Sequence, residues 1–323
     1  MKIAITGATG FVGRHLALAL NRLGHEVVLI ARGLDERDRE IRTLPNSTFY
    51  KIGLEETEKL GQAFNGCDAI AHCAGINRER HPGDYQKVHV DGTASVIEAA
   101  SHASVHKIVL MSFFRARPHC KSGYHESKWR AEELVRNSGL DYTVLKCGMA
   151  YGLGDHMLDH LSHVLYTLPV FGTVGFNEKL IYPVAVSDVV AIMVAALTEK
   201  KLSRETVAVR GPDAMLLSDA VKIVAGSIHK TAIIFPMPVA FHYTMAAVLE
   251  KVMKVPLVST AQIRMLEEGF SEAYPADLST PQGELKPQTR FSEQTIRAGL
   301  PPAGPFTNKD LLLGCHRASR NFS

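Results

Sequence analysis

The chain has 323 residues, 46% of them hydrophobic, with 36 Lys and Arg against 33 Asp and Glu and a net charge of +3. This length is enough for a large core, in one extended α/β unit or in two lobes. The charge is too small, and the basic residues too dispersed, for a nucleic-acid partner. The five cysteines form no CxxC pair, which favours a reducing compartment, the cytoplasm, over a disulfide or zinc framework.

A glycine-rich turn stands at the start of the chain. An apolar run over 2–6 breaks into Gly7, Gly10 and Gly13, and a helical pattern follows over 11–23. A strand, a tight turn and a helix aim backbone N–H groups at an anion, typically a dinucleotide pyrophosphate. The alternative is that this segment is an ordinary turn without a ligand. We also expect no cleaved leader peptide, because cleavage would remove this loop. The predicted cofactor loop comprises Gly7, Thr9, Gly10, Phe11, Val12 and Gly13.

Apolar runs alternate with helical patterns in the first half of the chain. The expected strands cover 26–31, 47–52, 68–72, 107–111 and 142–145. The expected helices cover 55–65, 85–103 and 122–137. Continuous apolar strands separated by helices predict an α/β fold with a doubly wound parallel sheet of the Rossmann type.

The pattern becomes irregular after Tyr151, where glycine, proline and histidine are frequent. We therefore predict an NAD(P)-binding Rossmann domain over 1–150 and a smaller, irregular C-terminal substrate lobe over 151–313. Some segments of this lobe, such as 207–209, are expected to return to the sheet. The last residues, 314–323, are expected to form a flexible tail.

The residue after the second strand bears on the choice of cofactor. NAD-selective sites commonly carry Asp or Glu there to bind the adenosine 2′-hydroxyl, whereas this chain has Arg32. A guanidinium favours a 2′-phosphate, so we predict NADP(H) over NAD(H). The alternative is that Arg32 and the nearby Arg14 are solvated arginines without such a role.

Small residues follow the fourth expected strand. Cys73, Ala74 and Gly75 would let a ribose or a nicotinamide lie against the backbone. A plain turn is the alternative interpretation. We include all three residues among the predicted cofactor contacts.

Three polar residues near the fifth strand predict acid/base chemistry. Ser112 follows that strand, and Tyr124 and Lys128 are four residues apart on an expected helix, hence on one face. An ammonium group beside a phenol lowers the phenol pKa from ~10 and makes it a usable acid/base. Ser112 would polarise a carbonyl oxygen, and Lys128 would also bind the nicotinamide ribose. The alternative is a chance Tyr-x-x-x-Lys spacing on a helix.

With these residues the chain resembles the short-chain dehydrogenase/reductase superfamily, in its extended or atypical branch. Within it, the chain is similar to NAD-dependent epimerases and dehydratases and to the group of the nucleotide-binding accessory subunit of respiratory complex I. The resemblance implies a Rossmann domain, an NAD(P)(H) cofactor and carbonyl/alcohol redox chemistry. Besides the glycine loop, it rests on Ser112, Tyr124, Lys128, His89–Thr93, Tyr151–Asp155 and Pro183–Val190.

Two departures from the family pattern matter. His89 replaces an Asn that helps to hold a proton-relay water in many relatives, although imidazole can still donate or accept a hydrogen bond. Cys147, Gly148 and Met149 replace a more usual proline-containing turn after the sixth strand. We count all four residues among the predicted cofactor contacts.

Two further segments suggest other functions. His156, His160 and His163 share one helix face beside two carboxylates, but we predict no metal because HExxH is absent and such reductases need none. The stretch 233–253 is long and apolar, but its uninterrupted part, 239–249, is far shorter than the ~20 residues of a membrane span. We interpret it as a packed helix, with a substrate lid or a peripheral membrane or partner contact as alternatives.

The sequence therefore predicts an NADP(H)-dependent oxidoreductase acting on a carbonyl or alcohol of a small molecule, as a reductase or in an epimerase/dehydratase-like cycle. A second hypothesis is a nucleotide-binding structural or assembly protein that holds NADPH tightly without turnover. A homodimer through the helices at 85–103 and 122–137 is a further expectation for the partners.

Overall fold

The computed structural model describes residues 1–33, 39–252, 258–268, 273–300 and 304–305. The chain divides into two compact units. Unit 1 consists of Met1–Gly148, Val186–Arg210 and Glu272–Gln288, and unit 2 of Met149–Ala185, Gly211–Ser271 and Thr289–Ser323. The tail predicted over 314–323 lies outside the described residues.

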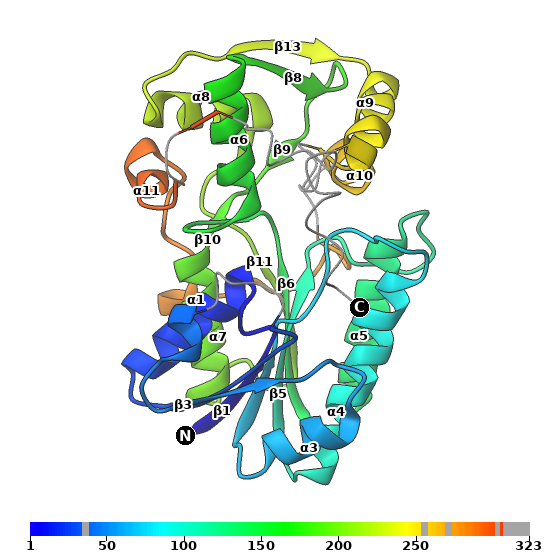
Figure 1. Cartoon of the computed structure of the whole chain (residues 1–323), viewed down its shortest axis with the longest axis vertical. Coiled ribbons are helices and arrows are strands. Elements are labelled where there is room, and N and C mark those ends of the chain that lie inside the picture. Colours follow the sequence, from blue (N-terminus) through cyan, green and yellow to red (C-terminus); the bar gives the residue numbers. More distant parts are fainter. Residues whose placement is uncertain (34–38, 253–257, 269–272, 301–303, 306–323) are drawn as a thin grey trace, which may run out of the picture. The chain divides into compact units, whose positions relative to one another are not determined.

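Within the described residues, unit 1 is built on a seven-stranded parallel sheet (Figure 1) with the strand order β11-β6-β5-β4-β1-β2-β3. This sheet confirms the predicted doubly wound α/β fold. Pairing of Val207 with Leu145 confirms the expected return of 207–209 to the sheet. The strands are β1 (Lys2–Thr6), β2 (Glu26–Ala31), β3 (Ser47–Lys51), β4 (Ala69–His72), β5 (Lys107–Phe113), β6 (Asp141–Cys147) and β11 (Glu205–Val209).

Helices connect these strands and cover the sheet. The helix expected over 85–103 begins as a π-helical turn, η2 (Gln86–Asp91), and continues as α4 (Gly92–His102). The short helix α2 (Arg39–Arg42) was not predicted. The other helical segments of unit 1 are α1 (Phe11–Arg22), α3 (Thr57–Phe64), α5 (Gly123–Arg136), α7 (Val186–Thr198) and η3 (Gly283–Leu285).

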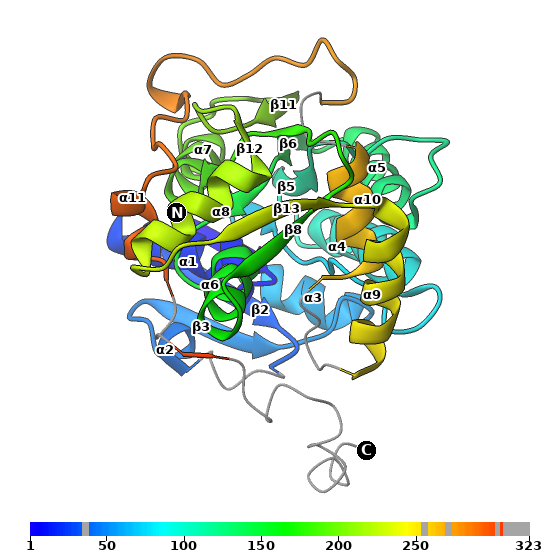
Figure 2. The ribbon, with the colours of Figure 1, turned by 90° about the horizontal axis from the view of Figure 1, so that it is seen from above.

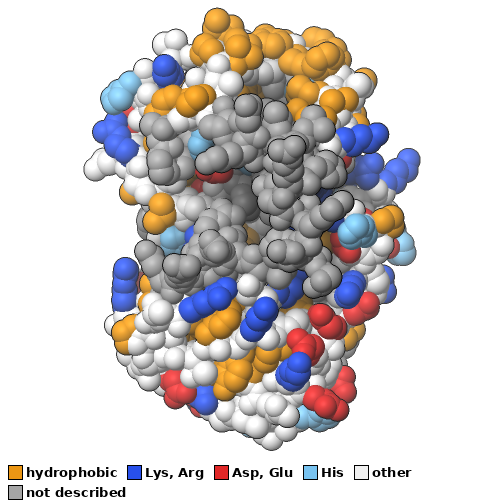
Figure 3. Space-filling model, viewed as in Figure 1, with side chains coloured by type: hydrophobic (Ala, Val, Ile, Leu, Met, Phe, Trp, Pro, Cys, Tyr) orange, Lys and Arg blue, Asp and Glu red, His pale blue; other side chains and the backbone are white. Residues whose placement is uncertain are grey.

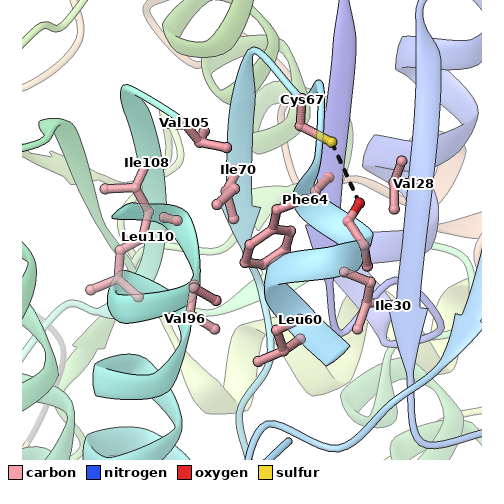
Figure 4. Packing of buried hydrophobic residues seen from close by; sticks show 14 of the residues in the cluster. Val28, Ile30, Leu60, Phe64, Cys67, Ile70, Val96, Val105, Ile108 and Leu110 are labelled. Atoms are coloured by element: carbon pink, nitrogen blue, oxygen red, sulfur yellow. Dashed lines mark hydrogen bonds between the residues drawn. The ribbon is translucent and has the colours of Figure 1, made fainter. Parts of the chain in front are cut away.

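A cluster of buried hydrophobic residues covers one face of the sheet. Phe64 and Leu60 of α3 and Val96 of α4 are fully buried against strand residues such as Ile70 and Ile108 (Figure 4). Burying one such side chain stabilises the fold by about 1.5–3 kcal/mol. This packing keeps the carboxyl ends of the parallel strands at one edge of the sheet, which is where ligands bind in such folds.

Unit 2 has short strand pairs in place of a continuous sheet. Its described strands pair as β10 with β7, β12 with β9 and β13 with β8. The strands are β7 (Ala150–Tyr151), β8 (Val170–Val174), β9 (Leu180–Ile181), β10 (Val184–Ala185), β12 (Met215–Leu216) and β13 (Ile233–Met237). The helices are α6 (His156–Thr167), α8 (Leu217–Ser227), α9 (Val239–Val252), α10 (Thr260–Glu268) and α11 (Glu293–Arg297).

The apolar stretch 233–253 differs from the packed helix that the sequence predicts. Its first part is the strand β13, and the helix α9 begins only after Pro238. A proline interrupts a helix interior but is tolerated where a helix starts, which explains the division. None of the helices in the described part of the chain is long and apolar enough to cross a membrane.

Candidate active site

The glycine loop has the close approaches that a nucleotide cradle requires. Gly7 has a positive φ of 70°, and the N–H groups of Gly7 and Ala8 both donate to the Ile30 carbonyl oxygen at the end of β2. Gly10 N donates to the Gly7 oxygen at 2.9 Å. A Cβ on Gly13 would lie 2.2 Å from that oxygen, so no larger residue fits without a shift.

The start of α1 leaves backbone donors available to an anion. Gly10 is the N-cap residue, and the first turn, with Phe11 and Val12, carries no acidic side chain. The first N–H groups of a helix have no intrahelical partner and attract negative charge. Together with Thr9 in the turn, these residues fit a dinucleotide pyrophosphate.

The loop after β4 lies directly against the glycine loop. Cys73 N donates to the Thr6 oxygen at 3.0 Å. A Cβ on Gly7 would lie 2.7 Å from both N and Cα of Ala74. Burial raises the pKa of the Cys73 thiol to about 12, although the nearby Lys128 opposes this shift. The predicted contacts Cys73, Ala74 and Gly75 thus continue the same edge of the sheet.

Basic side chains surround the end of β2. Arg32 is exposed, and Gly33 follows it with a φ of +68°. A Cβ on Gly33 would lie 3.2 Å from Lys51 Cγ and 3.5 Å from an Arg42 Nη atom. The sequence interpretation named only Arg32. The structure adds Lys51, which pairs with Ala31 in the β2–β3 register.

Helix α5 brings Tyr124 and Lys128 to the ends of β4 and β5. Ser122 caps the helix by accepting a hydrogen bond from His125 N at 3.4 Å. The Lys128 ammonium donates to the Met111 oxygen at 3.0 Å and faces Gly75, where a Cβ would lie 3.3 Å from Nζ. Burial lowers the pKa of Lys128 to about 8, against opposing contributions from Glu132 and Cys73.

The predicted lowering of the Tyr124 pKa by Lys128 is wrong. Tyr124 is only 6% exposed, and burial, followed by Tyr85 and Cys147, raises its pKa. Its ring lies 5.3 Å from that of Phe113 and 5.7 Å from that of His89, measured between centroids. The ammonium instead contacts the Met111 carbonyl of β5, and its charge acts to lower the pKa values of His72 and Cys73 at the end of β4.

His89 is a neutral hydrogen-bonding group in this structure. Its Nε2 accepts from Ile76 N at 3.1 Å, which leaves Nδ1 to carry the proton and donate to Ser127 Oγ at 2.8 Å. Burial, then Lys128, lowers the pKa of His89 far below its usual range. His89 therefore ties the loop after β4 to helix α5.

Ser112 lies in a buried polar cluster that the sequence interpretation did not find. Its hydroxyl donates to Glu132 Oε1 at 2.5 Å, and that carboxylate also receives Lys146 Nζ at 2.8 Å. All three side chains are buried. The signal was Lys146 itself, because a cation inside an otherwise apolar strand requires a buried partner. The orienting role of Ser112 stays a prediction.

The turn after β6 marks the boundary between the two units. Gly148 N donates to the Val209 oxygen at 3.0 Å within unit 1, whereas Met149 O accepts from Val184 N within unit 2. Cys147 is buried, and burial raises its pKa to about 12. Contacts of these three residues with a cofactor stay predictions.

The described residues include no group of three or more His, Cys, Asp and Glu side chains arranged to hold a metal ion. Asp155 instead caps α6, accepting hydrogen bonds from Leu158 N and Gly152 N at 2.7 Å each. Burial raises the pKa of this carboxyl to about 6. His163 contacts the Asp159 carbonyl one turn earlier, at 2.7 Å.

Comparison with known proteins agrees with this geometry. Residues 7–155 match the family model described as NAD(P)H-binding. This part of the chain is similar to that NAD(P)H-binding family. The match contains the glycine loop, the loop after β4, and both Tyr124 and Lys128.

Some curated relatives are similar to a longer part of the chain than the family model. An uncharacterized protein of Mycobacterium tuberculosis is 27% identical over 278 residues, 86% of this chain but only 29% of that protein, so the chain spans under a third of its length. The mitochondrial NADH dehydrogenase [ubiquinone] 1 alpha subcomplex subunit 9 of Mus musculus is 27% identical over 72% of this chain and 63% of its own. Ceramide reductase of Caulobacter vibrioides is 29% identical over 60% of each chain.

Solved structures share the fold. UDP-glucuronic acid 4-epimerase of Bacillus cereus, in complex with UDP-glucuronic acid and NAD, has a TM-score of 0.68 and 19% identity, covering 93% of this chain and 98% of that one. A short-chain dehydrogenase/reductase superfamily protein of Agrobacterium tumefaciens with bound NAD has a TM-score of 0.60 and 19% identity, covering 74% and 86%. These likenesses confirm the predicted α/β fold.

Proposed function

We propose that the chain is an NADP(H)-dependent oxidoreductase of the short-chain type, acting on a carbonyl or alcohol of a small molecule. The observation that carries the proposal is the continuous contact along one sheet edge. The glycine loop touches Ala74, and Gly75 in turn faces Lys128, one helical turn from Tyr124. These contacts support a cofactor cradle and an acid/base pair on the same edge.

The proposed chemistry assigns one task to each side chain. NADPH, when bound, supplies a hydride to a carbonyl carbon. Lys128, beside Gly75 and the Met111 carbonyl, hydrogen-bonds the ribose hydroxyls. Tyr124 donates its phenolic proton to the carbonyl oxygen and regains a proton from solvent. With a raised pKa the phenol holds its proton at neutral pH, and it is a weaker acid than an ordinary phenol.

Ser112 is the least supported part of this proposal. In the predicted role its hydroxyl orients the carbonyl oxygen, yet that hydroxyl already donates to the Glu132 carboxylate. It can serve a substrate only after leaving this partner. A Ser112→Ala variant that keeps full turnover would remove Ser112 from the mechanism and leave Tyr124 and Lys128 in it.

The proposed preference for NADP(H) rests on positive charge at the end of β2. Arg32 is exposed there, and the Lys51 and Arg42 side chains approach Gly33. A 2′-phosphate binds such cations, whereas a 2′-hydroxyl gains little from them. We expect calorimetry to give a lower Kd for NADPH than for NADH, and Arg32→Ala to reduce the ratio by about tenfold. Equal affinities in the wild-type protein would refute the preference.

A Tyr124→Phe variant tests the catalytic proposal. It should bind NADPH as the wild type does and lose turnover by about 10²-fold or more, because one proton donor is removed. Tyr142→Phe is the matched control, since Tyr142 is half-buried at the start of β6, at the opposite end of that strand from Cys147. The carbonyl panel should contain long-chain ketones and keto derivatives of nucleotide sugars, the classes suggested by the ceramide reductase and epimerase likenesses. Unchanged turnover in Tyr124→Phe would refute the assignment of Tyr124 as the proton donor.

A second candidate function is a nucleotide-binding structural or assembly protein that holds NADPH without turnover. The engaged Ser112 hydroxyl favours it, as does the likeness to a subunit of mitochondrial NADH dehydrogenase. The discriminating measurement is the reduced-nicotinamide absorbance of cofactor that stays with the purified protein. A band that persists across the whole carbonyl panel would favour this second function.

The remaining parts of the proposal concern partners and location. We propose a small-molecule substrate, no nucleic-acid partner, a cytoplasmic location and a homodimer through α4 and α5. The near-neutral charge and the absence of a CxxC pair support the first three. Sedimentation equilibrium of the purified protein tests the dimer.

A further inference from the structure

The helix α9 of unit 2 turns an apolar face to solvent. Its exposed positions are spaced three or four residues apart and therefore lie on one side of the helix. They are Ala240, Phe241, Thr244, Ala247, Val248 and Lys251. A surface helix normally exposes charged and polar residues and buries its apolar stripe. Here Phe241 is 54% exposed and Val248 is 55% exposed.

The opposite side of α9 is held in place by the rest of unit 2. His242 is buried, and its ring contacts the Pro238 oxygen at 3.3 Å and the Gly172 oxygen of β8 at 3.2 Å. Ala246, one turn later, is fully buried. The helix therefore cannot rotate its apolar face inward without breaking these contacts.

Strand β13 extends this surface. Ile233 is 64% exposed and Phe235 is 40% exposed, and both lie on the strand that immediately precedes α9. Hydrophobic side chains gather over β13 and α9 at the top of the space-filling view (Figure 3). Figure 2 shows β13 beside β8, its partner strand. We call Ile233, Phe235, Phe241 and Val248 the apolar surface.

Long acid-free stretches and flanking lysines surround the apolar surface along the chain. Residues 220–249 contain no Asp or Glu, and neither do residues 164–177, which contain β8. Exposed lysines stand at both ends: Lys230 precedes β13, and Lys251 lies in the last turn of α9. Two carboxylates lie nearby: Glu250 accepts from Thr260 N at 3.0 Å and Glu267 from the Tyr243 hydroxyl at 3.1 Å.

We propose that the apolar surface docks on an anionic lipid membrane, a property beyond the proposed oxidoreductase function. Phenyl and aliphatic side chains enter the region between headgroups and acyl chains, while flanking lysines attract anionic headgroups. Pro236 removes a backbone donor from β13, which disfavours docking by addition of a protein strand. Since no described helix is long enough to cross a bilayer, the contact is peripheral.

Vesicle co-sedimentation of the full chain tests this proposal. Vesicles of phosphatidylethanolamine with roughly 30% phosphatidylglycerol should bind the protein, and pure phosphatidylcholine vesicles should bind it weakly. The double variant Phe241→Gln, Val248→Gln should bind about a hundredfold less. Lys230→Gln should bind about fivefold less at low salt, with the difference shrinking at high salt. Leu23→Gln is the matched control, because Leu23 of unit 1 is 60% exposed and outside the surface.

Three results would overturn the proposal. The first is the absence of binding to the anionic vesicles, and the second is equal binding by wild type and double variant. The third is a protein dimer in sedimentation that the double variant abolishes, which would assign the surface to a second copy. NADPH affinity, measured on the same samples, should not change in any variant, so that failure of the membrane proposal and failure of the cofactor proposal are distinguishable.

Discussion

In unit 1 the strands β1, β2 and β4 are almost fully buried, whereas β13 of unit 2 leaves Ile233 64% and Phe235 40% exposed. Unit 1 also buries Ser112, Glu132 and Lys146 together in a bonded cluster that contains an ion pair. In unit 1 the packed strands hold the sheet edge where a ligand can bind. In unit 2 apolar side chains of β13 remain exposed on the surface.

The largest effect is expected from the buried ion pair of unit 1. Glu132→Gln leaves the Lys146 ammonium, which is buried, without its carboxylate, and should lower the free energy of unfolding by about 3–5 kcal/mol. Glu133→Gln is the control, because its pair with Arg136 is partly exposed and worth ~0–1 kcal/mol. Urea denaturation measures both. Similar losses in the two variants would show that the Glu132 pair is solvated and the comparison of the units wrong.

A smaller effect is expected in the glycine loop. Gly13→Ala puts a Cβ against the Gly7 oxygen, so the loop must shift, at a cost of about 1–3 kcal/mol, and NADPH affinity should fall sharply. Gly61→Ala in α3 meets only the Ala99 oxygen, at 3.9 Å, and should be harmless. Calorimetric titration with NADPH measures the outcome. Wild-type affinity in Gly13→Ala would place the cofactor elsewhere.

The pH dependence of stability tests the burial of polar groups in unit 1. His72 bonds to Thr6 and Thr93, and burial, then Lys128, lowers its pKa to about 3. Between pH 6.5 and about 3 the unfolded chain binds a proton at His72 that the folded chain does not, so stability falls as the pH falls. His72→Gln should flatten the Tm profile over this range, and His102→Gln, on the exposed side of α4, should not. An unchanged slope in His72→Gln would contradict the burial of this ring.

The smallest effect is expected on the surface of unit 2. Phe241→Gln removes an exposed ring, so the free energy of unfolding should change by no more than about 0.5 kcal/mol. Thermal unfolding of the purified variant measures this change. A loss above about 1 kcal/mol would mean that Phe241 contributes to a core and that the two units do not differ as described.

Local patterns in the sequence predicted those features that depend on residues close to one another in the chain. The glycine spacing and the apolar runs predicted the first strand, the glycine turn and the parallel sheet, because turn geometry and strand burial are encoded over a few residues. The Tyr124–Lys128 spacing likewise predicted a shared helix face.

Features that depend on packing between distant residues could not be predicted in this way. The sign of the Tyr124 pKa shift follows from burial and from Tyr85 and Cys147, which no spacing rule connects. The direction of the Ser112 hydroxyl depends on Glu132, twenty residues away on another element. The exposed face of α9 was also missed, because an apolar residue in a sequence predicts burial by default.

The central claim is that unit 1 holds NADPH and reduces a carbonyl with Tyr124 as the proton donor. The most direct measurement is NADPH oxidation by the wild-type protein and by Tyr124→Phe, with the carbonyl panel and with NADPH binding measured in parallel. The account predicts turnover on at least one carbonyl class that Tyr124→Phe loses while its NADPH affinity stays unchanged. Tight NADPH binding with no oxidation of the cofactor by any carbonyl would contradict it.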